Sequence, residues 1–479
     1  MNRKIVALLM ALSLVVGAAG TYFGIQYANA GTVSTPLTTS SNDSKVEKEE
    51  LDKIKQAYEL ISSKYYKDVD DKKLLDGAIQ GMVQTLGDPH SSYMDKKTAQ
   101  QFTQSLDSSF EGIGAEVSMV DGKVTIVAPF KQSPAEKAGL KPNDQILKID
   151  GKSIAGLELN EAVLKIRGKK GSTVTLDVQR PGVKETMKVK VVRDEIPIET
   201  VYSSVKNVNN KKIGYMEITS FSESTGDEFT KQLKKLENKN IDGLVLDVRG
   251  NPGGYLTSVE KMLDKLVTNK KPYIQIEDRN GERQKVVSSM KKKKDYPIVA
   301  LIDGGSASAS EILAGALKEA GGYKLVGEKS YGKGTVQQAV PMEDGSNLKL
   351  TFYKWLTPDG NWINEKGIKP TVEVKQPDYY YANPIQVDKK PLTRDMTGDQ
   401  VKNAQVMLKG LGFEPGRTDG YFSKETETAV TAFQKANKQK ATGEIDEDTA
   451  ALLQTKLLEK IKSKDEDRQL QTALKLASQ

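Results

Sequence analysis

Residues 243–254 read Gly-Leu-Val-Leu-Asp-Val-Arg-Gly-Asn-Pro-Gly-Gly, an apolar run followed directly by a glycine-rich turn. Such a run is typical of a strand that is buried on both faces of a parallel sheet. Functional groups of α/β folds collect at the carboxyl ends of these strands. Successive glycine N–H groups can also form an oxyanion pocket, and because Pro252 has no N–H the donor would be Gly253 or Gly254. A plain tight turn explains the same residues equally well.

The segments around this stretch predict an α/β core. Residues 213–218 read as a strand, and residues 225–236 have helical spacing. A second buried strand, 297–302, leads through two glycines into a helix over 308–320. Strand, glycine turn and helix in this order are a common setting for a functional residue in α/β folds.

Three serines, Ser306, Ser308 and Ser310, stand at the start of that helix. A hydroxyl there faces unpaired backbone N–H groups and the positive end of the helix macrodipole, and both stabilise an alkoxide or a nearby oxyanion. Ser308 and Glu311 also match a capping box, in which the serine has a structural role only. The segment alone leaves catalysis and capping open, and spacing does not choose among the three serines.

A second candidate segment, residues 330–338, places Lys333 between Gly332 and Gly334. Glycines remove side-chain bulk, so a lysine held between them can enter a dry site. Burial can lower the pKa of a lysine by several units from about 10.4, and a neutral amine near pH 7 can take a proton from serine. Gln337 falls on the same side of the chain and could orient the amine by a hydrogen bond. A surface turn with a solvated lysine is the alternative, and the phosphate-loop pattern is not matched.

Two residue counts restrict the chemistry of this 479-residue chain. It contains no cysteine, which excludes a cysteine nucleophile, a disulfide framework and a thiolate metal site. Its single histidine, His90, excludes a zinc site built from several imidazoles and would be the only base for a Ser–His–Asp arrangement. His90 itself reads as a structural residue in a helix-ending turn. A nucleophilic mechanism therefore needs a lysine or carboxylate base, and we expect neither a metal nor a cofactor.

The charge balance argues against a nucleic-acid partner. The formal net charge of +7, from 71 basic and 64 acidic residues, is small for this length. A nucleic-acid binder should show a concentrated basic face with aromatic residues. The one obvious basic run, 291–294, reads as a solvated loop.

The N-terminus, residues 1–30, reads as an export signal. Two basic residues precede an apolar stretch over 5–19, and Ala-Asn-Ala at 28–30 fits a cleavage site. Apolar residues continue beyond the stretch, so an uncleaved membrane anchor is the alternative. In both cases we expect the body of the protein outside the cytoplasm, after a Ser/Thr-rich linker over 31–43.

The rest of the chain divides into further units, since its length allows about three domains of roughly 150 residues. Residues 44–91 have helical spacing with one apolar face, which suits dimerisation. Short strands and turn signals from 110 to about 190 predict a small β-rich module. A last helical unit covers 392–457, and a charged tail over 458–479 is expected to be helical.

Four of these motifs, found in this order, resemble the C-terminal processing peptidases of family S41. They are Leu-Gly-Asp-Pro-His-Ser at 86–91, Arg-Gly-Asn-Pro-Gly-Gly at 249–254, Ser-Ala-Ser-Ala-Ser-Glu at 306–311 and Tyr-Gly-Lys-Gly-Thr-Val-Gln at 331–337. The resemblance covers roughly residues 45 to 375. It implies a multidomain protein with α+β and α/β parts: N-terminal helices, a PDZ β-module, an α/β serine-protease core at 190–385 and a small helical C-terminal unit.

The resemblance also assigns roles in a serine–lysine dyad. Ser308 would be the nucleophile, Lys333 the general base and Gln337 the residue that supports the lysine. The N–H groups of Gly253 and Ala309 would form the oxyanion hole.

A PDZ domain over residues 92–182 is a further implication, and such a domain binds the free C-terminus of a peptide. Backbone N–H groups of its loop would hold the carboxylate while the peptide adds a strand to the sheet edge. A β-bulge explains the two glycines of that loop equally well. Arg167 is a candidate relay between the PDZ domain and the protease, and a plain surface arginine is the alternative. The loop consists of Gly112, Ile113, Gly114 and Ala115.

The unit over 392–457 resembles a type 1 peptidoglycan-binding domain, which would place the enzyme near a cell wall. A helical appendage for dimerisation is the alternative. The whole layout resembles family members that act in sporulation signalling. This implies a homodimeric, PDZ-gated protease that cuts an exported or membrane-tethered regulator, in the forespore intermembrane space. The other functions left open are a non-catalytic PDZ scaffold and a wall-binding adaptor.

Overall fold

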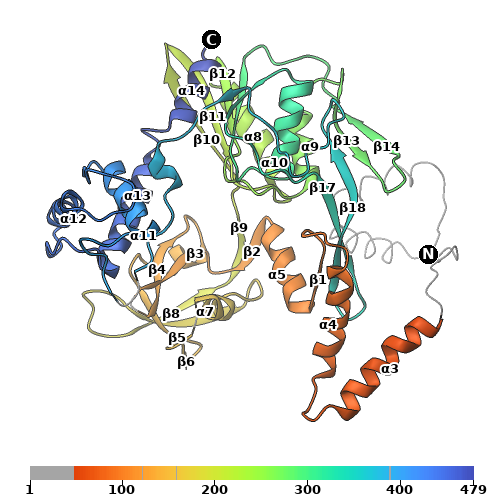
Figure 1. The fold of residues 1–479 in the computed structure, drawn as a ribbon, viewed down its shortest axis with the longest axis horizontal. Coiled ribbons are helices and arrows are strands. Elements are labelled where there is room, and N and C mark those ends of the chain that lie inside the picture. The colour runs from red at the N-terminus through yellow and green to blue at the C-terminus, as the bar shows by residue number, and fades with distance from the viewer. Residues whose placement is uncertain (1–47, 121, 158, 388–389) are drawn as a thin grey trace.

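The computed structural model describes residues 48–120, 122–157, 159–387 and 390–479 (Figure 1). The predicted export signal or anchor and the linker, residues 1–43, lie outside these ranges. Among the helices that are described, none has both the length and the apolar character needed to cross a membrane. The predicted fold class is confirmed: N-terminal helices, a β-rich module, an α/β core and a helical C-terminal unit follow one another along the chain.

The α/β core is built on a six-stranded sheet in the order β10-β11-β12-β15-β16-β19. All neighbouring strands are parallel except β10 and β11. β12 and β15 lie at the centre and every residue in them is buried, as the two apolar runs predict. The strands are β10 (Val201–Val208), β11 (Lys211–Ile218), β12 (Gly243–Asp247), β15 (Ile298–Ile302), β16 (Lys324–Gly327) and β19 (Val372–Glu373).

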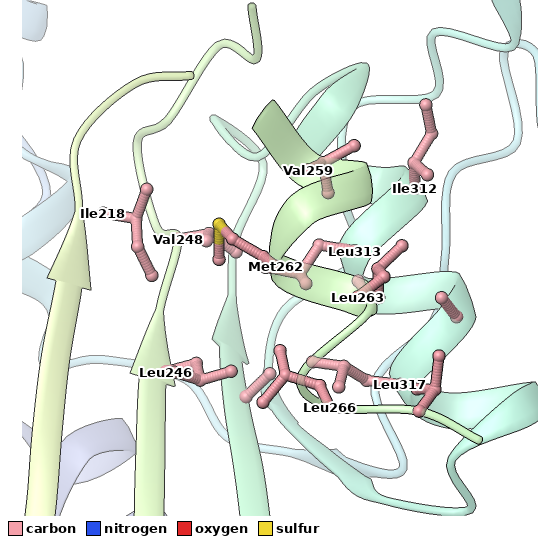
Figure 2. Packing of buried hydrophobic residues seen from close by; sticks show 14 of the residues in the cluster. Ile218, Leu246, Val248, Val259, Met262, Leu263, Leu266, Ile312, Leu313 and Leu317 are labelled. Atoms are coloured by element: carbon pink, nitrogen blue, oxygen red, sulfur yellow. The ribbon is translucent and has the colours of Figure 1, made fainter. Parts of the chain in front are cut away.

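Side chains alternate between the two faces of this sheet, as strand geometry requires. Leu246 belongs to the cluster packed under α8 (Thr225–Glu237), α9 (Leu256–Leu263) and α10 (Ala309–Gly315). Figure 2 shows the centre of this cluster, where side chains of the strands meet those of α9 and of α10 with its continuation. These contacts hold the start of α10 at the carboxyl edge of the sheet, where the candidate nucleophile lies.

The opposite face is covered by the end of the chain. The predicted charged tail consists of the last turns of α13 (Glu447–Ser463) and of α14 (Arg468–Ala477), which packs on β12 and β15. Its buried residues Leu470, Ala473 and Ala477 lie on one helical face and contact the sheet. The expected core boundary at 385 is therefore too early, because the chain returns to the core after the C-terminal unit.

A second sheet carries the segment that contains the candidate base. Its strands run in the order β1-β18-β13-β14, and β17 pairs with β18. β1 comes from the N-terminal region, with Ser92 opposite Lys349. The expected start of the PDZ module at residue 92 thus differs from the structure, in which 92–94 belong to the protease. The strands are β1 (Ser92–Met94), β13 (Pro272–Glu277), β14 (Arg283–Val287), β17 (Thr335–Pro341) and β18 (Asn347–Leu356).

The β-rich module has its own sheet, in the order β3-β4-β5-β7-β8, and its own hydrophobic core. Helix α7 (Leu159–Ile166) packs against this sheet, and β2 (Ser109–Gly112) pairs with β9 (Asp194–Pro197) where the chain enters and leaves. The module sheet consists of β3 (Ala115–Val120), β4 (Lys123–Pro129), β5 (Gln145–Ile149), β7 (Thr173–Gln179) and β8 (Met187–Val192), with β6 (Lys152–Ser153) on β5 and the short helix α6 (Pro134–Lys137).

The two terminal regions are helical, as predicted. α3 (Lys48–Lys64) and α4 (Asp71–Gln84) precede α5 (Lys96–Leu106), and the apolar stripe of α3 is exposed in the single chain, with Leu51 59% and Ile54 53% accessible. Dimerisation through these helices stays a prediction. The C-terminal unit packs α11 (Asp399–Gly410), α12 (Lys424–Ala436) and α13 around a separate core.

Candidate active site

Ser308 lies at the junction between β15 and α10, directly before the first residue of the helix. Its backbone has φ 53° and ψ −113°, a conformation that a residue with a Cβ rarely adopts. Strain of this kind persists only where the surrounding structure enforces it, and it concentrates at functional sites. The strained position puts the half-buried Ser308 on the wall of a cleft of about 310 Å³.

The structure distinguishes Ser308 from its two neighbours, which the sequence could not do. Ser306 Oγ donates to the carbonyl oxygen of Val248 at 2.8 Å, and Ser310 Oγ donates to that of Asn251 at 2.9 Å. Both of these serines are fully buried, so their hydroxyls tie the helix start to the turn after β12. Of the three serines, Ser308 is the one that lines the cleft.

Glu311, one turn into α10, connects the helix start to the segment that carries the candidate base. Its Oε2 accepts from the N–H of Ser308 at 2.9 Å and from the N–H of Lys333 at 2.8 Å. Its Oε1 accepts from Ser330 Oγ at 2.6 Å and from the N–H of Gly332 at 2.7 Å. Of the predicted capping box, the bond from the Ser308 N–H to the Glu311 carboxylate is present, while the Glu311 N–H donates to the Ser308 carbonyl oxygen at 2.8 Å. The fully buried carboxylate therefore does more than cap a helix, because it fixes the backbones on both sides of the cleft.

The backbone of Lys333 is held at both of its polar groups. Glu311 accepts from its N–H, and Trp355 Nε1 donates to its carbonyl oxygen at 2.8 Å. The flanking glycines are required by close packing: a Cβ on Gly332 would lie 3.0 Å from the nitrogen of Gly367, and one on Gly334 would lie 2.7 Å from that of Asn364. The glycines thus let the chain approach a neighbouring turn.

Burial lowers the pKa of the Lys333 amine below its ordinary value, and the nearby cation of Lys349 lowers it further. The carboxylates of Asp88 and Glu311 act in the opposite direction but do not cancel this effect. The amine therefore loses its proton more readily than a solvated lysine, which is the property that a general base needs. Lys333 and Ser308 line the same cleft, the other walls of which come from Phe102, Thr103, Pro252, Gly253, Gly254, Tyr255, Leu256, Ala309, Ile312, Thr335, Val336, Gln337, Ala339, Lys349 and Trp355.

Gln337 also lines this cleft, although a bulge interrupts the pairing of β17 with β18 between Val336 and Gln337. Its Nε2 donates to Thr335 Oγ1 at 2.8 Å and to Thr351 Oγ1 at 3.1 Å. Both amide protons are used in these two bonds, so Oε1 is the end of the side chain that can accept from an amine.

The two expected oxyanion donors lie side by side but differ in their availability. A Cβ built on Gly253 would lie 2.8 Å from Ser308 Cβ and 3.0 Å from the nitrogen of Ala309, so the three residues meet at one point. The N–H of Ala309 belongs to the first turn of α10 and has no partner inside the helix. The N–H of Gly253, in contrast, donates to Asn251 Oδ1 at 2.9 Å. Gly253 can serve an oxyanion only if that bond is exchanged or shared.

Several residues that line the cleft or lie beside it were not singled out from the sequence. Lys349 and Thr351 lie on β18, and Trp355 follows on the same strand. Strand pairing alone brings them to the site, so no local pattern could have identified them. Asp88 was part of a quoted motif, and its charge reaches Lys333.

His90 lies nearer to the candidate base than its sequence context indicated. Its N–H donates to Asp88 Oδ1 at 3.0 Å, as expected of a residue in a turn. Burial lowers the pKa of its imidazole, and the charge of Lys333 lowers it further. The interpretation of His90 as a structural residue stays a prediction.

The candidate peptide groove of the β-rich module lies between β3 and α7. The loop Gly112–Ala115 joins β2 to β3, and Gly114 has φ 73° and packs directly on Ser133. A small cavity of about 60 Å³ is lined by this loop, by α7 and by Arg167. The Arg167 guanidinium stacks on Phe110 with 4.6 Å to the ring centroid, and within the described residues its buried Nε atom has no hydrogen-bond partner.

Comparisons with known proteins cover the whole chain. The sequence matches peptidase family S41 over residues 212–374, the N-terminal domain of the activating protease CtpB over 14–98, a PDZ domain over 112–191 and a putative peptidoglycan-binding domain over 397–453. It is 58% identical to the carboxy-terminal processing protease CtpB of Bacillus subtilis, covering 99% of each chain, and 43% identical to CtpA of that organism, covering 91% of each. Among solved structures it is similar to a photosystem II D1 C-terminal processing protease, with 27% identity, a TM-score of 0.43, and coverage of 67% of this chain and 86% of that chain.

The role of Glu311 leads to a prediction about activity and stability. Glu311→Gln replaces one acceptor oxygen by an NH₂ group that faces two donors. We expect kcat to fall at least about 100-fold, the cost of a displacement of about 1 Å at a catalytic group. The melting temperature should fall by about 5 °C or more, because hydrogen bonds to charged groups contribute about 1.5–3 kcal/mol each. Peptide hydrolysis and thermal unfolding measure the two effects.

The exposed Glu343 on the β17–β18 hairpin provides the matched control, because Glu343→Gln should change neither quantity. A Glu311→Gln enzyme as active and as stable as the wild type would contradict the bridging role.

Proposed function

The chain belongs to peptidase family S41 and is a carboxy-terminal processing serine protease with a PDZ domain, and from this premise we propose that it works by a Ser308–Lys333 dyad supported by Gln337. The observation that carries the proposal is the shared cleft. It brings a strained serine at a helix start together with a lysine whose pKa is lowered by burial, and the buried Glu311 binds the backbone of both.

The reaction would proceed through an acyl-enzyme. The neutral Lys333 amine takes the proton of Ser308 as its oxygen attacks the peptide carbonyl carbon. The Ala309 N–H and, after release from Asn251, the Gly253 N–H stabilise the negative charge on the former carbonyl oxygen. Lys333 then gives its proton to the leaving amine as the C–N bond breaks. A water molecule, deprotonated by the same amine, hydrolyses the ester and restores the free serine.

The PDZ domain would gate this activity by binding the free C-terminus of a protein or peptide. Amide groups of the Gly112–Ala115 loop would hold the carboxylate, while the peptide extends along the edge of β3. Arg167 lies at the end of this groove, stacked on Phe110 of β2, and β2 pairs with β9, the strand through which the chain returns to the protease. A peptide that displaces Arg167 from Phe110 would change the junction formed by β2 and β9. We therefore propose Arg167 as the relay between the two domains.

We also propose where the enzyme acts, from its relationship to CtpB and from its C-terminal domain. The peptidoglycan-binding-like domain and the relationship to CtpB support a location outside the cytoplasm, near a cell wall. Export through the N-terminal segment, a homodimer formed by the exposed face of α3 and cleavage of an exported or membrane-tethered regulator of sporulation complete the proposal.

Removing either member of the dyad should abolish proteolysis. We expect Ser308→Ala and Lys333→Ala to lower casein digestion at least about 1,000-fold, since members of a nucleophile–base pair act as one unit. The exposed residues Ser289 and Lys285 serve as controls, and their alanine variants should keep wild-type activity. Digestion by either dyad variant at the wild-type rate would refute the dyad. An inactive wild type with intact peptide binding would favour a PDZ scaffold instead.

The pH dependence follows from the lowered pKa of Lys333. Only the neutral amine can act as a base, so kcat/KM should rise with pH, about tenfold per unit below the midpoint. Because burial lowers this pKa, the midpoint should lie below 10.4, the ordinary value for lysine. Rates with a peptide substrate from pH 6 to 10 measure the curve. A flat profile over this range would show that no lysine base titrates there.

The relay role of Arg167 predicts a loss of regulation. With Arg167→Ala we expect the difference between hydrolysis rates with and without a regulatory peptide to vanish. Kinetics with a free C-terminal peptide measure this difference, and the same peptide with an amidated C-terminus is the control ligand. The exposed neighbour Lys169 gives a control variant, Lys169→Ala, which should respond like the wild type. An unchanged peptide response of Arg167→Ala would remove the relay.

A further inference from the structure

Asp88 belongs to the turn that follows α4, yet it lies beside the active-site cleft. Strand β1 follows this turn and pairs with β18, with Ser92 opposite Lys349. This pairing places the turn next to Thr351, on the strand that neighbours Gln337. Asp88, a residue of the N-terminal helical region, thereby contacts the strand that pairs with the Gln337 segment.

A continuous set of hydrogen bonds leads from Asp88 to Gln337. Asp88 Oδ2 accepts from Thr351 Oγ1 and from Ser91 Oγ, each at 2.6 Å, while its Oδ1 accepts from the N–H of His90 at 3.0 Å. The N–H of Thr351 donates to Ser91 Oγ at 3.0 Å. Gln337 Nε2 then donates to Thr351 Oγ1 at 3.1 Å. Asp88, Ser91, Thr351 and Gln337 are all half-buried, so these bonds are partly shielded from water.

The direction of each bond follows from counting protons. An ionised carboxylate can only accept, so Thr351 must give its single hydroxyl proton to Asp88. The hydroxyl oxygen of Thr351 is then left as an acceptor and can pair only with the NH₂ end of the Gln337 amide. Thr335 Oγ1 accepts from the same NH₂ group at 2.8 Å. The carbonyl end, Oε1, is therefore turned away from β18.

We propose that Asp88 and Thr351 are positioning residues, which fix the orientation of the Gln337 amide so that Oε1 is the group offered to the Lys333 amine. This inference rests on the proposed function, because it assumes that Gln337 supports Lys333. If Asp88 could donate, Thr351 could give its proton to Gln337 Oε1, and the amide would rotate. Lys333 would then meet an NH₂ group, which cannot accept a hydrogen bond.

The charge of Asp88 has a second, separable effect. The charged groups that act on Lys333 are the cation Lys349 and the anions Asp88 and Glu311. His90 also lies near Lys333, but burial and the charge of Lys333 lower the pKa of its imidazole, which favours the neutral form. Bonds from Ser91 and Thr351 keep the pKa of Asp88 low against the opposing effect of its burial, so Asp88 stays ionised. Its negative charge stabilises the protonated form of Lys333. Removing that charge should therefore move the acid limb of the pH–rate profile to lower pH.

A set of isosteric variants of the full chain tests the orientation. Thr351→Val removes the hydroxyl at constant size, and Asp88→Asn lets the Asp88 position donate. We expect kcat to fall about 10- to 100-fold in both, the range found when a group that orients a functional side chain is lost. Thr351→Ser keeps the hydroxyl and should stay within about threefold of the wild type. Asp76, which accepts from Tyr93 Oη at 2.6 Å in the same region, supplies the control Asp76→Asn, with unchanged kcat expected.

A double-mutant cycle separates positioning from a general loss of structure. If Thr351 acts through Gln337, then Thr351→Val in a Gln337→Ala background should cause no further loss of kcat. Additive losses, or full activity of Thr351→Val, would overturn the proposal. Full activity of Gln337→Ala would instead refute the role of Gln337 in the proposed function. The positioning role of Asp88 and Thr351 would then be refuted as well.

The pH–rate profile adds a readout that unfolding cannot mimic. Asp88→Asn should shift the acid limb to lower pH as well as lower the plateau, whereas Thr351→Val, which keeps the charge, should mainly lower the plateau. An Asp88→Asn profile with an unmoved or raised midpoint would contradict the arrangement of charges.

Discussion

The carboxylate of Glu311 is the constraint on which the site depends. It accepts hydrogen bonds from Ser308, Ser330, Gly332 and Lys333, at 2.6 to 2.9 Å, while fully buried. A buried charge is tolerated only if hydrogen bonds replace its lost hydration, and here four donors do so. Because the donors come from two separate segments, satisfying this one charge brings the serine and the lysine to the lining of one cleft.

The C-terminal segment stabilises the turn that carries Gly253 through an ion pair with Arg249. Arg249 is nearly buried between Asp247 and Asp467, at 2.6 and 2.8 Å. Asp467 caps α14, the helix that covers the rear face of the central strands. Two residues after Arg249, the carbonyl oxygen of Asn251 accepts from the N–H of Ala307 at 3.0 Å and from Ser310 Oγ. Buried polar contacts thus connect the C-terminal helix to the segment that carries the candidate nucleophile.

The accessory regions contact the protease through short, identifiable links. The PDZ domain is joined by the paired strands β2 and β9, and the N-terminal region by β1 and the turn that contains Asp88. Each link ends close to a group of the cleft or of the candidate peptide groove. The α/β core therefore carries the candidate catalytic groups, while separate modules contact it at its margins.

The amino-acid sequence by itself determined the elements that depend on local pattern. Runs such as 243–248 predicted buried strands, the serines at 306–310 predicted a helix start, and the glycines around Lys333 indicated that this lysine could enter a dry site, with a surface turn as the alternative. Motifs in order were enough to predict the fold class and the candidate dyad. These features are readable because periodicity, capping and glycine requirements act between residues that are near in the chain.

Tertiary structure alone decided which serine lines the cleft, what Glu311 binds and where the ends of the chain belong. Ser306 and Ser310 were excluded by carbonyl groups more than fifty residues away, at Val248 and Asn251. β1 and α14 joined the protease through partners far along the chain, so the expected boundaries at 92 and 385 differed from the structure. All of these features have one physical reason. A buried polar group or apolar face is paired with residues that are distant in the chain, and the local sequence does not determine which residues these are.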